Sequence, residues 1–264
     1  MKLTTLIENT TCNPALTKEH GLSLFLETKG KQILFDTGQT DAFASNAAAL
    51  GINLSETDIA ILSHGHYDHG GGLKTFLEQN KIAPVYISRH AFGEFYNGTE
   101  KYIGLDTSLE KSDRIIFIDD VFKINNQMTL YSCNDREKKY PANSFGLLMK
   151  NGENFVDDDF RHEQYLEVTE NDKKILVSGC SHKGILNIMN WFSPDILIGG
   201  FHFTKLLPSG DTVSELTEAS EILSGYPAVY YTCHCTGVQQ YDFMKGIMSD
   251  RINYASAGDR LDIF

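Results

Sequence analysis

The sequence has few of the features that mark secreted, membrane or nucleic-acid-binding proteins. Its 264 residues include five cysteines, an odd number without the spacing of a disulfide framework, which favours a reducing cytoplasm. No apolar run approaches the length of a membrane span. Positive charge is scarce, because 23 Lys and Arg against 35 Asp and Glu give a formal net charge of −12. This balance argues against nonspecific binding to nucleic acids and against attraction to anionic membranes.

The amino terminus does not resemble a targeting signal. Met1–Asn9 alternates as a strand does, and Glu8 interrupts it before an apolar signal core could form. Hydrophobic residues make up 41% and charged residues 22% of the chain, as in ordinary globular proteins. A chain of this length does not need to be divided into two domains. We therefore expect one cytoplasmic domain, residues 1–264; the oligomeric state stays open.

The most distinctive stretch is Ser63–Gly72, which follows the apolar run Asp58–Leu62. It places three histidines and one aspartate within six positions: His64, His66, Asp68 and His69. Imidazole and carboxylate are ligands of zinc, iron and manganese, and the neighbouring glycines allow a tight turn. His64 and His66 would share one side of a continuing strand. The turn would aim Asp68 and His69 at a second centre, so the stretch predicts two metal ions.

A polar loop whose histidines only satisfy hydrogen bonds is the alternative to a metal site. Desolvating four titratable groups together without a metal would cost much free energy. We therefore prefer the metal site.

Periodicity predicts an α/β order of elements along the whole chain. Helices are expected at about 41–50, 73–79, 184–191, 212–223 and 238–248, and short apolar strands alternate with them. The segment from 90 to 113 lacks clean periodicity, and we interpret it as an excursion over the active-site mouth. The acidic run Asp157–Asp159 is expected to be a solvated loop. His90 and His162 are interpreted as ordinary histidines.

Three further histidines, His182, His202 and His234, stand at the ends of apolar strands. Strand ends at one rim of a sheet are where α/β folds place ligands and catalysis. These histidines are therefore candidate site residues. Cys233 and Cys235 flank His234 in opposite phase on an expected strand, so both are predicted to point away from it and pack in the core.

The pattern His64-x-His66-x-Asp68-His69 (HxHxDH), with Leu34–Gly38 upstream, resembles the metallo-β-lactamase superfamily, and the order of elements is similar over nearly the whole chain. Four other segments resemble the branch named for dihydropterin-ribofuranosylaminobenzene-phosphate synthase, an archaeal enzyme of methanopterin synthesis: Glu19–Ser23, Ser178–His182, Gly199–His202 and Thr232–Gly237. The resemblance implies a four-layer αββα sandwich with the metals at one edge, between the two sheets.

The resemblance also implies a ligand set. His64 and His66 would bind the first metal and Asp68 and His69 the second, and His234 matches the final histidine of the family.

The usual third histidine of the first site has no clear match between 140 and 169, and the usual bridging aspartate falls about where Cys180 stands. His182 is the natural substitute ligand for the first metal. The alternative is that His182 only caps or stabilises its loop. Cys180 is either a bridging thiolate or a small buried hydrophobe, and the sequence leaves both open.

Two residues are candidates for contacts around the ligands. Asp36, at a strand break, would accept a hydrogen bond from a metal-bound imidazole, although aspartate also forms turns locally. His20 would reach the site mouth or stay on the surface.

The leading functional hypothesis is a metal-dependent hydrolase with two divalent ions, zinc before manganese or iron. A metal-bound hydroxide would attack an ester, lactone or phosphoester. Asp68 would orient the water or take a proton, and His202 would act as an acid or hold a substrate oxygen. The expected partner is a small molecule, which an anionic or phosphorylated group would suit because the two ions carry a positive field.

Two other functions use the same ligands. A synthase-like transferase would bind and polarise a pterin diphosphate. A diiron redox protein or a metal sensor is the third hypothesis, because imidazole and carboxylate suit iron as well as zinc.

Overall fold

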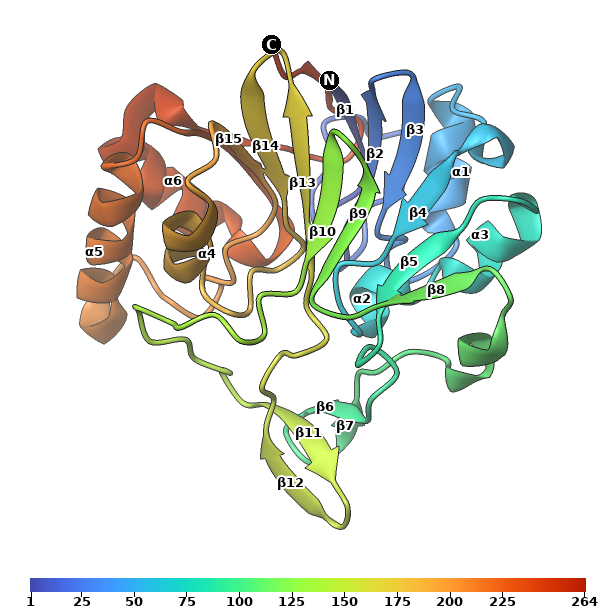
Figure 1. Cartoon of the computed structure of the whole chain (residues 1–264). Helices are drawn as coiled ribbons and strands as arrows, with labels where there is room; N and C mark the ends of the chain where they lie inside the picture. The colour runs from blue at the N-terminus through green and yellow to red at the C-terminus, as the bar shows by residue number, and fades with distance from the viewer.

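The protein is described here by a computed structural model of residues 1–264. Two seven-stranded sheets face each other, and helices cover their outer faces (Figure 1). Both termini lie at the end of the sandwich opposite a small projecting sheet (Figure 1). The predicted four-layer αββα sandwich is confirmed.

The first sheet is built mainly from the amino-terminal half, in the order β18-β1-β2-β3-β4-β5-β8. Its strands are β1 (Lys2–Ile7), β2 (Ser23–Thr28), β3 (Lys31–Phe35), β4 (Ile59–Ile61), β5 (Val85–Ser88), β8 (Ile115–Ile118) and β18 (Arg260–Asp262). From β3 to β8 the strands are parallel. The helices α1 (Ala42–Ala49) and α3 (Leu73–Gln79) lie on its outer side (Figure 1).

The second sheet has the order β17-β16-β15-β14-β13-β10-β9. Its strands are β9 (Val121–Asn125), β10 (Met128–Tyr131), β13 (Tyr165–Glu170), β14 (Lys173–Val177), β15 (Ile196–Ile198), β16 (Val229–Thr232) and β17 (Ile252–Tyr254). From β14 to β17 the strands are parallel, whereas β13 is antiparallel to β14. Its outer face is covered by α4 (Ile185–Phe192), α5 (Val213–Ser224) and α6 (Val238–Met248).

Strand alternation explains how one sequence fills three apolar layers. Leu24 and Leu26 of β2 belong to the core between the sheets, whereas Phe25 packs under the helices of the first sheet. In β14, Ile175 and Val177 likewise face the central core, and Leu176 faces the helices of the second sheet. The central strands of both sheets are therefore buried on both faces.

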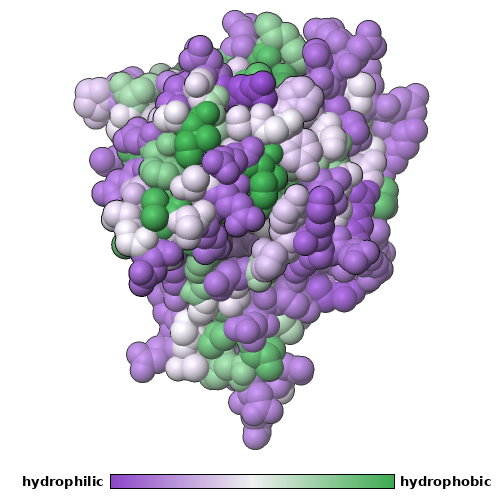
Figure 2. Space-filling model, turned by 90° about the vertical axis from the view of Figure 1, so that its left-hand side faces the viewer, coloured by the Kyte–Doolittle hydropathy of each residue, from purple (hydrophilic) through white to green (hydrophobic).

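A small third sheet projects from one end of the sandwich (Figure 1). Its order is β12-β11-β6-β7, with β6 (Phe95–Asn97), β7 (Lys101–Tyr102), β11 (Leu147–Asn151) and β12 (Asn154–Asp157). The 90–113 segment thus supplies one hairpin of this sheet, followed by a 3-10 helix at Thr107–Lys111. The projection forms the narrow lower end of the molecule in Figure 2, where hydrophobic and hydrophilic residues are mixed.

Two strands end earlier than the sequence pattern predicts. β15 ends at Ile198 and β16 at Thr232, so His202 and His234 lie in turns, with φ of 58° and 50°. Both values are in the left-handed region, which is costly for residues other than glycine. None of the helices combines the length and the apolar character needed to cross a membrane.

Candidate metal centre

Parallel strands bring the histidines of distant segments to one edge of the sandwich. Cys180 and His182 follow β14, His202 follows β15 and His234 follows β16, and these three strands point the same way. From the opposite sheet, β4 leads into the His64–His69 loop. That loop ends in the short helix α2 (Tyr67–Gly70), which carries Asp68 and His69.

Glycine allows the backbones of the two sheets to approach closely at this edge. A Cβ atom on Gly179 would lie 2.2 Å from Ser63 Oγ and 3.2 Å from His64 Nδ1. A Cβ atom on Gly65 would lie 2.2 Å from the carbonyl oxygen of Ala91. A larger residue at Gly179 would push the histidine loop away from the Cys180 turn, and one at Gly65 would push the same loop away from the turn at Ala91.

The first cluster of ligand atoms consists of His64, His66 and His182, all buried, whose ring nitrogens lie within 4.8 Å of one another. Nε2 of His64 is 3.2 Å from Nε2 of His182. The buried Nε2 of His66 and Nδ1 of His182 have no hydrogen-bond partner. A buried imidazole nitrogen without a partner is costly, and three neighbouring imidazoles are a donor set that fits a divalent ion.

The second cluster consists of His20, Asp68 and His234, again within 4.8 Å. Oδ2 of Asp68 lies 3.2 Å from Nε2 of His20 and 3.4 Å from Nε2 of His234. Nε2 of His69 is 3.3 Å from Nε2 of His234. One carboxylate and three imidazoles thus face one point, a donor set that also fits a divalent ion.

Cys180 lies between the two clusters. Its Sγ is 3.1 Å from Nε2 of His69, and it belongs to donor groups that include both His64 and His234. This placement agrees with a bridging position. Burial raises the pKa of the Cys180 thiol, and the neighbouring Cys235 adds to this, so without a metal the thiol stays protonated.

Burial and mutual repulsion lower the pKa values of His64, His66 and His182. These imidazoles are therefore neutral near pH 7, the form that binds a metal. Burial would raise the pKa of Asp68, but the neighbouring His69, His20 and His234 outweigh it and hold that pKa well below its ordinary value. The carboxylate is therefore ionised and able to bind a cation.

Asp36 supports the loop as the sequence suggested. Its Oδ2 lies 2.7 Å from Nδ1 of His69, and its carboxylate also accepts hydrogen bonds from the backbone N–H and the hydroxyl of Ser63. The second ring nitrogen of His69 is thereby turned towards Cys180 and His234.

Two buried glutamates that sequence reasoning did not single out hold the remote ligand turns. Oε1 of Glu163 accepts the backbone N–H of His182 at 2.6 Å. Oε1 of Glu8 accepts the backbone N–H of His234 at 2.6 Å. Each carboxylate also accepts a tyrosine hydroxyl, from Tyr165 and Tyr254 respectively. Charge-assisted bonds of this kind fix the backbone of a turn firmly.

Asp158 and His162 are corrections to the sequence interpretation. Asp158 belongs to the acidic run expected to be solvated, yet it is buried, and its Oδ2 lies 3.1 Å from Nε2 of His162 and 3.5 Å from Nε2 of His66. His162 is also buried, and its Nδ1 accepts the backbone N–H of Gly65. Both residues therefore brace the first cluster.

Cys235 is a further correction. Because β16 ends at Thr232 and His234–Thr236 forms a 3-10 turn, strand phase does not apply to it. Its Sγ joins a donor group with Cys180 and His234. Cys233, by contrast, packs in the central core as predicted.

A cavity of about 230 Å³ opens over the two clusters. The candidate ligands His66, Asp68, Cys180, His182 and His234 line it, and His20 and His202 lie at its wall. A neighbouring cavity of about 390 Å³ shares His182, His202 and Phe145 with it. His202 therefore stands between two hollows, and its buried Nδ1 has no hydrogen-bond partner.

Comparisons with known proteins agree with this geometry. Residues 16–136 match the sequence profile of the metallo-beta-lactamase superfamily. The uncharacterized protein MJ0448 of Methanocaldococcus jannaschii is 31% identical over 229 residues, which cover 83% of this chain and 84% of the relative. The chain belongs to the metallo-beta-lactamase superfamily.

Two more relatives of this superfamily member match nearly its full length. The 7,8-dihydropterin-6-methyl-4-(beta-D-ribofuranosyl)-aminobenzene-5'-phosphate synthase of Methanocaldococcus jannaschii is 28% identical over 266 residues, 90% of this chain and 88% of the synthase. The crystal structure of Tm1679, described as a metal-dependent hydrolase of the beta-lactamase superfamily, has a TM-score of 0.81 and 28% identity, and the match covers 100% of this chain and 99% of Tm1679. The metallo-beta-lactamase fold implies divalent metal binding, for which both clusters offer ligands.

Proposed function

We propose that the protein is a hydrolase with two divalent ions, zinc first, and that it cleaves an ester, lactone or phosphoester. The observation that carries the proposal is the convergence of two donor clusters, buried except for His20, on one cavity, with Cys180 between them. His64, His66 and His182 would hold the first ion, and Asp68, His69 and His234 the second. Bound ions would supply Lewis acidity and lower the pKa of a water molecule between them.

Asp68 has a second role in this proposal. Its carboxylate is ionised, because His69, His20 and His234 overcome the effect of burial on its pKa, and it faces the cavity. It would orient the attacking water and accept its proton. His20, 3.2 Å away, would hold that carboxylate in place.

His202 is the candidate proton donor. Its ring is 4.3 Å from that of His182 between centroids, and it faces both cavities without being one of the six histidine and aspartate ligands. A leaving group that moves from the metal cavity into the neighbouring one would pass this imidazole. In the protonated form it would donate to the leaving oxygen.

A panel of esters, lactones and phosphodiesters tests the hydrolase proposal. We expect turnover by the metal-loaded protein that His66→Ala abolishes, because that change removes a ligand of the first ion. His90→Ala is the matched control, since His90 is an exposed histidine outside the clusters. The hydrolase proposal is wrong if no member of the panel gives turnover that depends on His66.

A synthase-like transferase is the second candidate function, favoured by the likeness to the dihydropterin synthase over 90% of this chain. The same residues would bind the phosphorylated groups of both reactants. Incubation of the metal-loaded protein with a dihydropterin diphosphate and ribofuranosylaminobenzene phosphate tests it. Absence of the condensed product would exclude this candidate.

Metal analysis of protein isolated without added metal tests the metal assignment. Two zinc or manganese ions per chain would support the proposal. Iron with visible colour would favour the diiron redox or sensor alternative, and a stoichiometry that stays at one under saturation would contradict the two-metal site. All five cysteines are free, which supports the proposed cytoplasmic location.

A further inference from the structure

The mouth of the metal cavity carries positive charge in a protein whose net charge is −12. Lys101 and Lys205 both line the cavity, and Asp68, a candidate ligand, is the one carboxylate among the lining residues. Neither lysine forms an ion pair: Nζ of Lys101 donates to the hydroxyl of Tyr67, and Nζ of Lys205 donates to the carbonyl oxygen of Phe145. Each ammonium group therefore keeps hydrogens that the protein does not bind.

The two lysines arrive from opposite halves of the chain along a continuous rim. Lys101 of β7 pairs with Asn97 of β6, and Asn97 pairs with Leu147 of β11. Phe145, which lies just before β11, accepts the hydrogen bond from Lys205. The projecting small sheet thus links one lysine to the other across the cavity.

The other polar groups on this rim are suited to an anion. Asn97, Thr204 and Tyr67 line the same cavity, and an amide, a hydroxyl and a phenol can each donate a hydrogen bond to oxygen. Two ammonium groups and several neutral donors match a phosphate group, with its two negative charges and several acceptor oxygens, better than a carboxylate.

From this rim we propose that the substrate carries a phosphate group apart from its reacting bond, and that Lys101 and Lys205 bind that phosphate. The proposal rests on the proposed function, because it takes the cavity as the reaction site. It makes the small sheet the specificity element of the enzyme. The reacting bond would then lie deeper, between the candidate ligands and His202.

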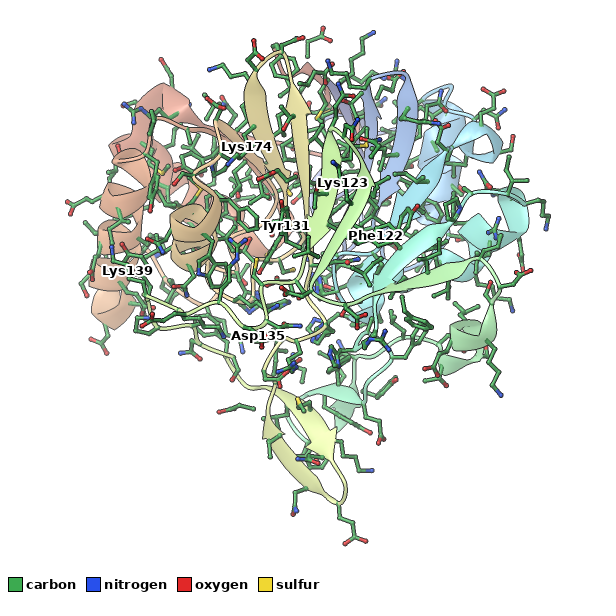
Figure 3. All side chains as sticks on the ribbon, viewed as in Figure 1. Phe122, Lys123, Tyr131, Asp135, Lys139 and Lys174 are labelled. Atoms are coloured by element: carbon green, nitrogen blue, oxygen red, sulfur yellow. The ribbon has the colours of Figure 1, made fainter.

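Calorimetric titration with phenylphosphonate, which is not hydrolysed, tests the anion site without turnover. The proteins compared are wild type, the double variant Lys101→Gln/Lys205→Gln and the control Lys123→Gln, each with zinc and after chelation. Lys123 is an exposed lysine on β9 without an ion pair, away from the small sheet (Figure 3). Benzoate serves as the carboxylate probe of the same ring.

We expect Kd for phenylphosphonate to rise about tenfold for each lysine removed, with and without zinc, and to stay unchanged in Lys123→Gln. Benzoate should bind more weakly than phenylphosphonate, and its Kd should change less when the two lysines are replaced. The proposal is overturned if the double variant binds phenylphosphonate as tightly as wild type does, because the metals would then be the groups that bind the anion. Equal binding of benzoate would overturn the assignment to phosphate.

A pair of ester substrates with and without a remote phosphate group separates this proposal from the proposed function. In the double variant, kcat/KM should fall for the phosphorylated ester and remain for the neutral one. If phenylphosphonate binds as expected but no ester is turned over, the result would contradict the hydrolase and support the phosphate site. Equal turnover of the two esters would support the hydrolase and contradict the phosphate site.

Discussion

Asp36 and His69 form a buried pair in which Oδ2 of the carboxylate lies 2.7 Å from Nδ1 of the imidazole. Both side chains are fully buried, and Asp36 has a φ of 62°, a left-handed conformation that aims its carboxylate back at the loop. The pair fixes which nitrogen of His69 faces the second cluster. A carboxylate behind a metal-binding histidine raises its basicity and fixes its orientation.

Asp36→Asn should weaken zinc binding at the second cluster by about 10- to 100-fold, because the amide cannot accept the same bonds from Ser63 and His69. Competition with a chromophoric chelator measures the affinity of each ion. The affinity of the first cluster should change less, because Asp36 reaches its ligand His64 only through the hydroxyl of Ser63, which lies 2.8 Å from Nδ1 of His64. An unchanged second affinity would contradict the supporting role of Asp36.

Glu163→Gln and Glu8→Gln should affect opposite clusters. Glu163 holds the backbone of His182, and Glu8 holds that of His234. Glu163→Gln should therefore weaken zinc binding at the first cluster, and Glu8→Gln should weaken zinc binding at the second. The loss of a buried charge-assisted bond should also lower the free energy of unfolding by about 2 kcal/mol. Stepwise zinc titration and urea unfolding measure both effects, and each variant is the control for the other. Loss of the same ion in both variants would be inconsistent with separate anchoring.

The candidate ligands could be predicted from the sequence because their signals are local. The His64–His69 loop follows an apolar strand, and His182 and His234 follow others, so parallel topology brings them together. The αββα order of layers could be predicted through the family resemblance. The small sheet could not be predicted, because β6 and β7 are three and two residues long and β6 pairs with β11, far along the chain.

The bracing residues were missed because their burial is a tertiary property. Glu163 and His162 precede β13, whose start lies at the site edge because β13 is antiparallel to β14. The orientation of β13 would have indicated that these two residues lie near the site, but it follows from the order of strands in the sheet. Asp158 has the composition of a solvated loop, and only the packing of His66 and His162 against it makes it a buried carboxylate.

Gly179→Ala should destabilise the metal-free protein by about 2 kcal/mol or more, because the new Cβ would lie 2.2 Å from Ser63 Oγ. Gly246→Ala is the matched control: it lies in α6 with open space around it. That change should stabilise the helix by up to about 1 kcal/mol. Urea unfolding after chelation measures both. Equal stability of Gly179→Ala and wild type would show that the two sheets tolerate a wider separation.

The metal-free protein should be most stable near pH 6.5, the ordinary pKa of histidine. Burial would lower the pKa of His69, but Asp36 and Asp68 outweigh it and raise that pKa to about 9. The folded state therefore holds a proton that the unfolded state releases, and stability falls as pH rises from 6.5 to 9, by up to about 3 kcal/mol. Burial and neighbouring histidines lower the pKa values of His64 and His182, so below pH 6.5 the unfolded state binds more protons and stability falls again.

Urea unfolding of the chelated protein at about pH 5, 6.5 and 9 measures this dependence. His69→Asn should reduce the alkaline slope and keep the acidic one, because it deletes the buried histidine whose pKa is raised to about 9. The contribution of His20 remains, since the hydrogen bond with Asp68 also raises the pKa of His20. Zinc should remove the alkaline slope and steepen the acidic one, since the ion holds the imidazoles neutral in the folded state while the unfolded state still gains protons below pH 6.5. An alkaline slope that is undiminished in His69→Asn would assign it to other groups and contradict the pairing of His69 with Asp36.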